Sequence, residues 1–214
     1  MTEPFYDPPK KEFKQEGTGV TVYSAQSGIE RQRLIVRKEI VEQMLTLAEQ
    51  AVSEGKFPYV ALLEYQGEVI ASAVNSIDLP TSKADLPIFE PPNAHPELNL
   101  VNKAVEIAEE TFPDNHDLQL NFLRDITIYA NCEPCSMCAL ALAGAHVSKI
   151  VFSISNNAAS KASGIEATPL TSTEQIFKNF GLEAQIVGPI EEERALITFT
   201  SAWKQVRDVI FGKE

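Results

Sequence analysis

Helix-like and strand-like patterns alternate along this chain, and the alternation restricts the folds that it can adopt. A helix pattern at residues 39–54 is followed by two short apolar runs, 59–65 and 69–75, on either side of a Gln-Gly-Glu turn, which predicts a β-hairpin. More strand patterns lie at residues 125–132, 149–155 and 183–188. More helix patterns lie at residues 94–112, 134–147, 171–181 and 191–211. Strands that alternate with helices after an opening hairpin predict an α/β fold, with a mixed sheet and helices on both faces.

Two stretches depart from this alternation. Residues 1–37 are rich in Pro, Lys, Glu and Gly, and we predict that they form an N-terminal arm or extension, followed by one domain at residues 38–214. The other stretch, residues 76–93, holds four prolines and shows little periodicity. It therefore predicts a long loop of the kind that often covers a site.

The composition limits the partners and the compartment. The 214 residues carry a formal net charge of −12, which repels phosphate backbones and disfavours nucleic acid as a partner. Basic residues within 10–38 leave RNA binding open if the arm folds near the site. No apolar run reaches the roughly 18 residues that span a bilayer, and no secretory signal opens the chain. Together with clustered cysteines, this predicts a cytoplasmic protein with no membrane partner.

All three cysteines lie in one octapeptide, NCEPCSMC, at residues 131–138. Cys135 and Cys138 are three positions apart in the first turn of a predicted helix, where their side chains face the same way and the helix dipole favours thiolates. They can therefore share one metal ion, but two thiolates leave a zinc site incomplete. A third ligand has to come from elsewhere, and Cys132 is a possible further ligand.

The third ligand is sought among three histidines. His116 lies in a polar loop, PDNHDL, and is expected to be solvated. His146 ends the helix of the cysteines, where a cation suits the helix dipole, so capping is favoured over metal binding. His95 opens a helix after a strand, as Cys135 does, so two junctions of one sheet can bring His95, Cys135 and Cys138 to one Zn²⁺. Three ligands with an open fourth position are typical of catalytic zinc.

Glu97 stands two residues after His95 and is the candidate catalytic residue. A carboxylate there can take a proton from a water molecule and pass it to a substrate. Taken alone, Glu97 is equally well explained as a first-turn glutamate that favours the helix dipole. Its significance depends on the residues around it.

The His-Pro-Glu of residues 95–97 and the Pro-Cys-Ser-Met-Cys of residues 134–138 match the His-x-Glu and Pro-Cys-x-x-Cys signature of zinc nucleobase deaminases. On these motifs the chain resembles the cytidine deaminase-like superfamily, over roughly residues 38–211. The resemblance implies a three-layer α/β/α domain around a mixed sheet of about five strands. It also implies Zn²⁺ on His95, Cys135 and Cys138, Glu97 as the proton shuttle, and hydrolytic release of ammonia from an amino base.

Asn75 and the cysteine motif indicate a branch of the superfamily. Asn75 resembles the strand-end asparagine that contacts the base in guanine deaminases and tRNA adenosine deaminases, although an asparagine that only turns the chain fits equally well. The motif CEPCSMC resembles its guanine deaminase version, which favours Cys132 as a packed residue beside the site rather than a ligand. The segments 155–164 and 188–205 are also similar to guanine deaminases, whose C-terminal segment can cover the pocket. Phe199 and Trp203 are candidates for that cover, and core packing is an equally good explanation of both.

Pro96 departs from the family pattern, which usually has alanine between histidine and glutamate. In several members the amide of that alanine donates a hydrogen bond to the base, and proline has no N–H to give. A ring atom left without its donor costs about 1–3 kcal/mol. Together with the long loop before His95, Pro96 predicts an altered substrate pocket.

The function expected from the resemblance is hydrolysis of an amino-purine, guanine to xanthine and ammonia, by a homodimer that binds a small nucleobase or nucleoside. The alternatives are a tRNA adenosine deaminase or its subunit, which the acidic charge disfavours, and a catalytically idle zinc-binding relative. A Cys-x-x-Cys redox protein needs only the two cysteines and leaves His95 and Glu97 unexplained.

Overall fold

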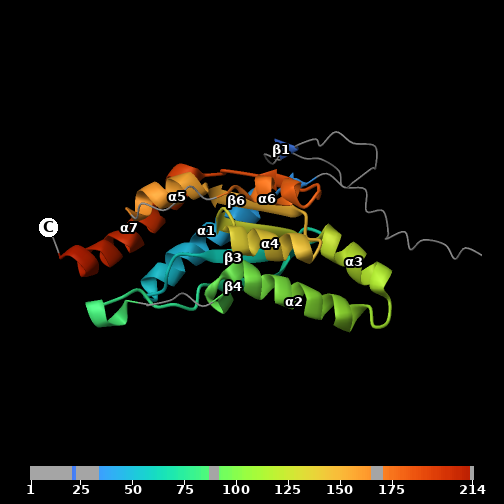
Figure 1. The fold of residues 1–214 in the computed structure, drawn as a ribbon, viewed down its shortest axis with the longest axis horizontal. Coiled ribbons are helices and arrows are strands. Elements are labelled where there is room, and N and C mark those ends of the chain that lie inside the picture. Colours follow the sequence, from blue (N-terminus) through green and yellow to red (C-terminus); the bar gives the residue numbers. More distant parts are fainter. Residues whose placement is uncertain (1–20, 23–33, 87–91, 165–170, 213–214) are drawn as a thin grey trace, which may run out of the picture.

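A five-stranded mixed sheet forms the centre of the computed structural model, which describes residues 21–22, 34–86, 92–164 and 171–212 (Figure 1). The strands run in the order β4 (Glu68–Val74), β3 (Val60–Tyr65), β5 (Thr127–Cys132), β6 (Lys149–Ile154) and β7 (Gln185–Val187). β3 is antiparallel to both β4 and β5, whereas β5, β6 and β7 are parallel. The predicted α/β class with a mixed five-stranded sheet is confirmed.

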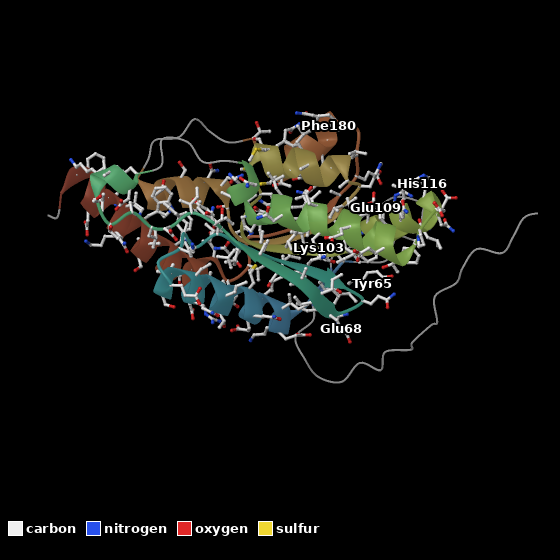
Figure 2. All side chains as sticks on the ribbon, turned by 90° about the horizontal axis from the view of Figure 1, so that it is seen from below. Tyr65, Glu68, Lys103, Glu109, His116 and Phe180 are labelled. Carbon is white, nitrogen blue, oxygen red and sulfur yellow. The ribbon has the colours of Figure 1, made fainter. Side chains whose placement is uncertain are left out.

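Helices cover both faces of the sheet, which confirms the predicted three layers. In Figure 2, α1 (Lys38–Ser53, blue) lies below the sheet, and α2 (Pro96–Thr111, green) and α4 (Ser136–Gly144, yellow) lie above it. One face carries α1 (Lys38–Ser53), α5 (Asn156–Ser163) and α7 (Glu192–Phe211). The other face carries α2 (Pro96–Thr111), α3 (His116–Asp125), α4 (Ser136–Gly144) and α6 (Thr173–Asn179). Each face buries its own cluster of apolar side chains between sheet and helices, which is the basis of an α/β/α sandwich.

The hairpin of β3 and β4 turns at Gln66 and Gly67, as predicted. Both residues have positive φ, 53° and 91°, which a two-residue type I′ turn requires. The Gly67 amide donates a hydrogen bond to Glu64 Oε1 at 2.5 Å. The φ of 91° at Gly67 favours glycine, and a Cβ there would lie 2.9 Å from the Arg37 guanidinium, which would have to shift.

Residues just before α1 join the core. Leu34 and Val36 are buried in the apolar cluster beneath α1. Residues Ile35–Val36 form β2, which pairs antiparallel with β1 (Thr21–Val22) in a separate two-stranded sheet that the sequence patterns did not predict. The rest of the predicted arm, residues 1–20 and 23–33, lies outside the described residues, so the domain boundary at residue 38 stays a prediction.

Two helices escape the sequence patterns. The prediction of a polar loop around His116 is wrong, because His116 is the first residue of α3. Asn115 caps this helix, since its side chain accepts a hydrogen bond from the Leu118 amide at 3.1 Å. α3 fully buries only Phe122 and Leu123, and α5 packs against the core mainly through alanines, so neither helix shows strong apolar periodicity. His116 is exposed, as expected, and lies on α3 at the edge of the molecule (Figure 2).

Other elements differ from the predictions in their bounds. The helix expected at residues 134–147 begins after Pro134 and ends at Gly144, and His146 follows it in a left-handed conformation with φ 61°. The loop expected at residues 76–93 contains two short 3-10 helices, η1 (Lys83–Asp85) and η2 (Pro92–Ala94), and its residues 87–91 lie outside the described part of the chain. Among the described helices, none has the length and apolar character needed to cross a bilayer.

Candidate metal centre

Two helix starts bring the predicted ligands together. His95 is the N-cap residue of α2 and directly follows η2, and Cys135 is the N-cap residue of α4 and follows β5. Cys138 lies in the first turn of α4. Because α2 packs against α4 on the same face of the sheet (Figure 1), the start of α2 lies beside the carboxyl end of β5. This is the edge at which open α/β sheets hold ligands.

The distances among the three side chains fit a tetrahedral zinc ion. His95 Nδ1 lies 3.7 Å from Cys135 Sγ and 3.5 Å from Cys138 Sγ, and the two sulfurs are 3.5 Å apart. Zn–S bonds of about 2.3 Å and Zn–N bonds of about 2.0 Å at tetrahedral angles place neighbouring ligand atoms roughly 3.5–3.8 Å apart. Within the described residues this is the group of His, Cys, Asp or Glu side chains that can hold a metal ion. The donor set and its spacing therefore fit Zn²⁺.

The two thiols share a hydrogen bond that makes them unequal. This bond, 3.5 Å between the two sulfurs, lowers the pKa of the Cys135 thiol, and the His95 ring adds to the lowering. The same bond, together with burial, raises the pKa of Cys138. Cys135 is therefore the thiol that ionises first, and a bound metal ion displaces the remaining proton because metal ligands must be deprotonated.

Glu97 is buried beside the three candidate ligands. It lies in the first turn of α2 with only 7% of its surface exposed. The Cys138 thiol donates a hydrogen bond to Glu97 Oε2 at 3.6 Å. Burial raises the pKa of Glu97 to about 7, because an apolar environment disfavours the charged carboxylate. Such a carboxyl group can both accept and release a proton near neutral pH.

Cys132 lies apart from the ligand group. It ends β5, pairs with Ile154 of β6, and is buried among apolar side chains. Burial raises the pKa of its thiol well above the ordinary value, which keeps it protonated. The side-chain atoms at ligand distance from one another belong to His95, Cys135 and Cys138 and do not include Cys132.

Comparison with known families agrees with this geometry. Residues 35–154, more than half of the 214-residue chain, match the family described as the cytidine and deoxycytidylate deaminase zinc-binding region. The chain belongs to this family. The predicted resemblance to the cytidine deaminase-like superfamily is thereby confirmed, and the family and the His/Cys/Cys group together fit Zn²⁺ binding.

Individual relatives of this deaminase-family chain act on different substrates. A tRNA-specific adenosine deaminase of Aquifex aeolicus is 27% identical over 106 residues, which cover 50% of this chain but only 58% of the relative. A structure from a study of A-to-I editing by tRNA:A34 deaminases superposes with a TM-score of 0.51 at 20% identity, covering 76% of this chain and 99% of the other. A guanine deaminase from Nitrosomonas europaea gives a TM-score of 0.50 at 18% identity, covering 76% and 82%. These two structures show a shared fold.

Asn75 turns the chain after β4, which is one of the two roles predicted for it. It directly follows β4 and is 2% exposed. Its backbone amide donates a hydrogen bond to the Tyr59 carbonyl at 2.8 Å, and its side-chain Oδ1 accepts one from the Ile77 backbone amide at 2.8 Å. The second bond is an Asx turn. A contact between Asn75 and a base stays a prediction.

Pro96 occupies the first helical position of α2. It is buried between the candidate ligand His95 and Glu97. Proline is well suited to this position, because the amide there has no partner within the helix. Compared with an alanine at this position, Pro96 gives this chain a rigid helix start and removes one backbone N–H donor next to the site.

Phe199 and Trp203 pack inside the chain, on the inner face of α7. Phe199 is fully buried and meets Tyr59 edge to face, with ring centroids 5.6 Å apart. Trp203 lies edge to face on Phe57, with ring centroids 5.5 Å apart. Core packing, one of the two explanations of both residues, is therefore observed. A role of Trp203 in binding substrate stays a prediction.

Asn131 is a buried polar residue that the sequence analysis did not single out. Its Oδ1 accepts a hydrogen bond from the Val60 amide at 2.8 Å, and its Nδ2 donates one to the Pro58 carbonyl. These bonds fix the segment that contains Tyr59, and the Tyr59 carbonyl in turn accepts the hydrogen bond from the Asn75 backbone amide. A polar residue at the end of an otherwise apolar strand, as in YANCEP, is the signal that could have revealed it.

Proposed function

We propose that this chain is a zinc-dependent hydrolytic deaminase that removes an amino group from the ring of a nucleobase or nucleoside. The observation that carries the proposal is the position of Glu97. Its buried carboxyl group lies within 3.6 Å of Cys138 Sγ, beside a His/Cys/Cys group with zinc-like spacing. A structural zinc site needs no such acid, and a redox pair of cysteines needs neither the acid nor the histidine.

The residues divide the chemistry between them. His95, Cys135 and Cys138 are proposed to hold the ion, which leaves one coordination position open. When bound, Zn²⁺ lowers the pKa of water and so supplies a nucleophile at neutral pH. Glu97 takes one proton from the attacking water at its carboxylate and delivers it to the ring nitrogen. It then takes the remaining proton of the added hydroxyl group as the ring carbonyl forms and delivers it to the amino group, so that the C–N bond breaks and ammonia departs.

We propose an amino-purine as the substrate, with guanine converted to xanthine and ammonia. The cysteine motif CEPCSMC and the C-terminal segment resemble guanine deaminases, and the net charge of −12 disfavours a tRNA stem-loop. In the described part of the loop before His95, Asp85 reinforces this charge, because hydrogen bonds from Thr81 and Ser82 lower its pKa and keep it ionised. Lys83 alone offsets it within residues 81–86.

A tRNA adenosine deaminase, acting from A to I, is the second candidate. The specific observation in its favour is the sequence relationship to the Aquifex aeolicus enzyme over 106 residues. A catalytically idle zinc-binding relative is the third possibility, and the intact Glu97 argues against it, since loss of the proton shuttle is the simplest route to inactivity.

The test is ammonia release by the purified, zinc-loaded chain from guanine, adenine, cytosine, their nucleosides and a tRNA anticodon stem-loop. The expected result is release from guanine that stops on chelation and returns with Zn²⁺. Release from the stem-loop alone assigns the second candidate. Silence throughout with one zinc bound means either that Pro96 and the long loop have moved the specificity beyond these substrates or that the chain is an idle relative. The expected homodimer is tested separately by light scattering on the same preparation.

A further inference from the structure

One carboxylate joins three parts of the chain immediately before the candidate ligands. Glu133 stands between Cys132 and Pro134, and its backbone amide donates a hydrogen bond to the Ile154 carbonyl at 2.7 Å. Its side chain accepts two more bonds, from the Asn156 amide to Oε2 and from the Thr173 amide to Oε1, each 3.0 Å long. The first residue of α5 and the first residue of α6 are therefore tied to the residue that precedes the ligand loop.

Thr173 closes this arrangement onto the loop itself. It is fully buried, and its hydroxyl donates a hydrogen bond to the Pro134 carbonyl at 3.1 Å. Glu133 thus fixes the Thr173 backbone, and the Thr173 side chain fixes the peptide that leads into Cys135. Because Pro134 also has a restricted φ, both sides of the peptide before Cys135 are held.

Capping alone does not account for these bonds. α5 already has the Ser155 hydroxyl, which accepts a bond from the Ala158 amide, and α6 has the Ser172 hydroxyl, which accepts one from the Gln175 amide. Each helix start is therefore capped by its own serine. The bonds from Glu133 to these two helix starts connect elements that are distant in sequence, and both lead to the junction of β5 and α4.

We propose that Glu133 is a positioning residue for the metal centre: it holds the Pro134–Cys135 junction so that Cys135 and Cys138 meet His95 at ligand distance. The inference rests on the proposed zinc site. Its physical basis is that bond lengths to zinc vary by only a few tenths of an ångström, while an untethered loop start moves by more than that. Outer partners of ligands commonly change metal affinity by about 10–100-fold.

The experiment measures zinc affinity by competition with a chromophoric chelator, and ligand geometry from the absorption spectrum of the Co²⁺-substituted chain. Glu133→Ala is expected to weaken zinc affinity at least tenfold and to alter the Co²⁺ spectrum. Glu133→Gln keeps one acceptor oxygen and places an amide donor against the other backbone N–H, so it is expected to lose less. Thr173→Val removes only the bond to Pro134 and keeps the shape of the side chain. It leaves the buried Pro134 carbonyl without this donor, so it is expected to weaken zinc affinity and to lower the melting temperature.

Glu192→Ala is the matched control. Glu192 Oε1 accepts hydrogen bonds from the Ser155 amide at 2.9 Å and the Ser155 hydroxyl at 2.8 Å, at the same end of α5 but without a bond to residues 133–135. It is expected to lower thermal stability and to leave zinc affinity and the Co²⁺ spectrum unchanged.

Zinc affinities of Glu133→Gln and Thr173→Val equal to that of the original chain would overturn the positioning role, even if Glu133→Ala does not fold. Failure of the proposed function would be seen in a different measurement. If the original chain binds zinc but releases no ammonia, the zinc affinities of the variants can still be compared with that of the original chain.

Discussion

Glu97 shows how a single residue acquires a chemical role from its surroundings. An acidic residue in the first turn of a helix is ordinary, and a pKa near its usual value suits that place. Here Glu97 is 7% exposed, and its carboxyl group accepts a hydrogen bond from the Cys138 thiol. Burial therefore converts a common capping residue into a group that holds a proton near neutrality.

Replacing Glu97 by glutamine is expected to remove turnover and to preserve the metal. The amide has the same shape as the carboxyl group but cannot carry the proton, so kcat should fall by about 10²–10⁴-fold. Zinc content by atomic absorption and the melting temperature should match those of the original chain. Turnover at the original rate with zinc bound would contradict the assigned role.

Cys132 and Cys138 provide a matched pair of substitutions at the same scale. Cys132→Ser is expected to leave one zinc per chain, because the Cys132 side chain lies in the apolar cluster outside the ligand group. Cys138→Ser removes a proposed ligand and is expected to leave the chain without zinc after dialysis. The measurement is zinc per chain by mass spectrometry of the eluted metal. A zinc-free Cys132→Ser chain would make Cys132 a fourth ligand.

At the scale of elements, the site depends on where helices start. α2 and α4 each begin at a ligand, since His95 and Cys135 are their N-cap residues. Neither His95 nor Cys135 is one of the usual N-cap residues, and neither side chain forms a capping hydrogen bond to its own helix. The two helix starts thus give up the usual capping contribution of about 1 kcal/mol, and their side chains are directed to the metal centre instead.

α7 illustrates an element whose inner face is structural. Phe199→Ala is expected to lower the free energy of unfolding by about 3–5 kcal/mol, because the ring is fully buried against Tyr59 and leaves a cavity. Ile197→Ala on the same helix is the control, since Ile197 is 72% exposed and should change stability by less than about 0.5 kcal/mol. Urea unfolding followed by circular dichroism measures both. Equal stabilities for the two variants would show that Phe199 does not support the core.

At the scale of the whole molecule, the apolar clusters of the core are formed by side chains other than the candidate metal ligands, although Cys138 is itself fully buried. The buried apolar clusters on the two faces of the sheet do not include His95, Cys135 or Cys138 among the described residues. The fold therefore has its own source of stability, and zinc adds to it by binding the folded state.

Removing zinc is expected to lower the melting temperature without unfolding the chain. At free zinc 100 times above its dissociation constant, binding adds about 2.7 kcal/mol, which corresponds to roughly 5–10 °C for a chain of this size. Differential scanning calorimetry with and without a chelator measures the shift. The Cys138→Ser chain should show no shift, and loss of the far-ultraviolet dichroism at 25 °C on chelation would show that the core cannot stand alone.

Much of this architecture is readable from the sequence because its signals are local. The strands of the central sheet and the long helices α1, α2 and α7 carry clear apolar periodicity, and the turn at Gln66 and Gly67 carries its own chemistry. The helices α3 and α5 do not, since α3 fully buries two apolar residues and α5 presents mainly alanines. Their helical state follows from capping and from packing against neighbours that local patterns do not record.

The amino-acid sequence alone indicates the α/β class through its alternating helix and strand patterns, and it indicates the candidate ligands and Glu97 through the two short motifs at residues 95–97 and 134–138. The three-dimensional structure was needed to show that Cys132 lies outside the ligand group, that Phe199 and Trp203 pack in the core, and that Glu133 ties two distant helix starts to the ligand loop. These facts depend on contacts between residues that lie from 23 positions apart, as Glu133 and Asn156 do, to 146 positions apart, as Phe57 and Trp203 do, and such contacts form only when the layers of the fold assemble.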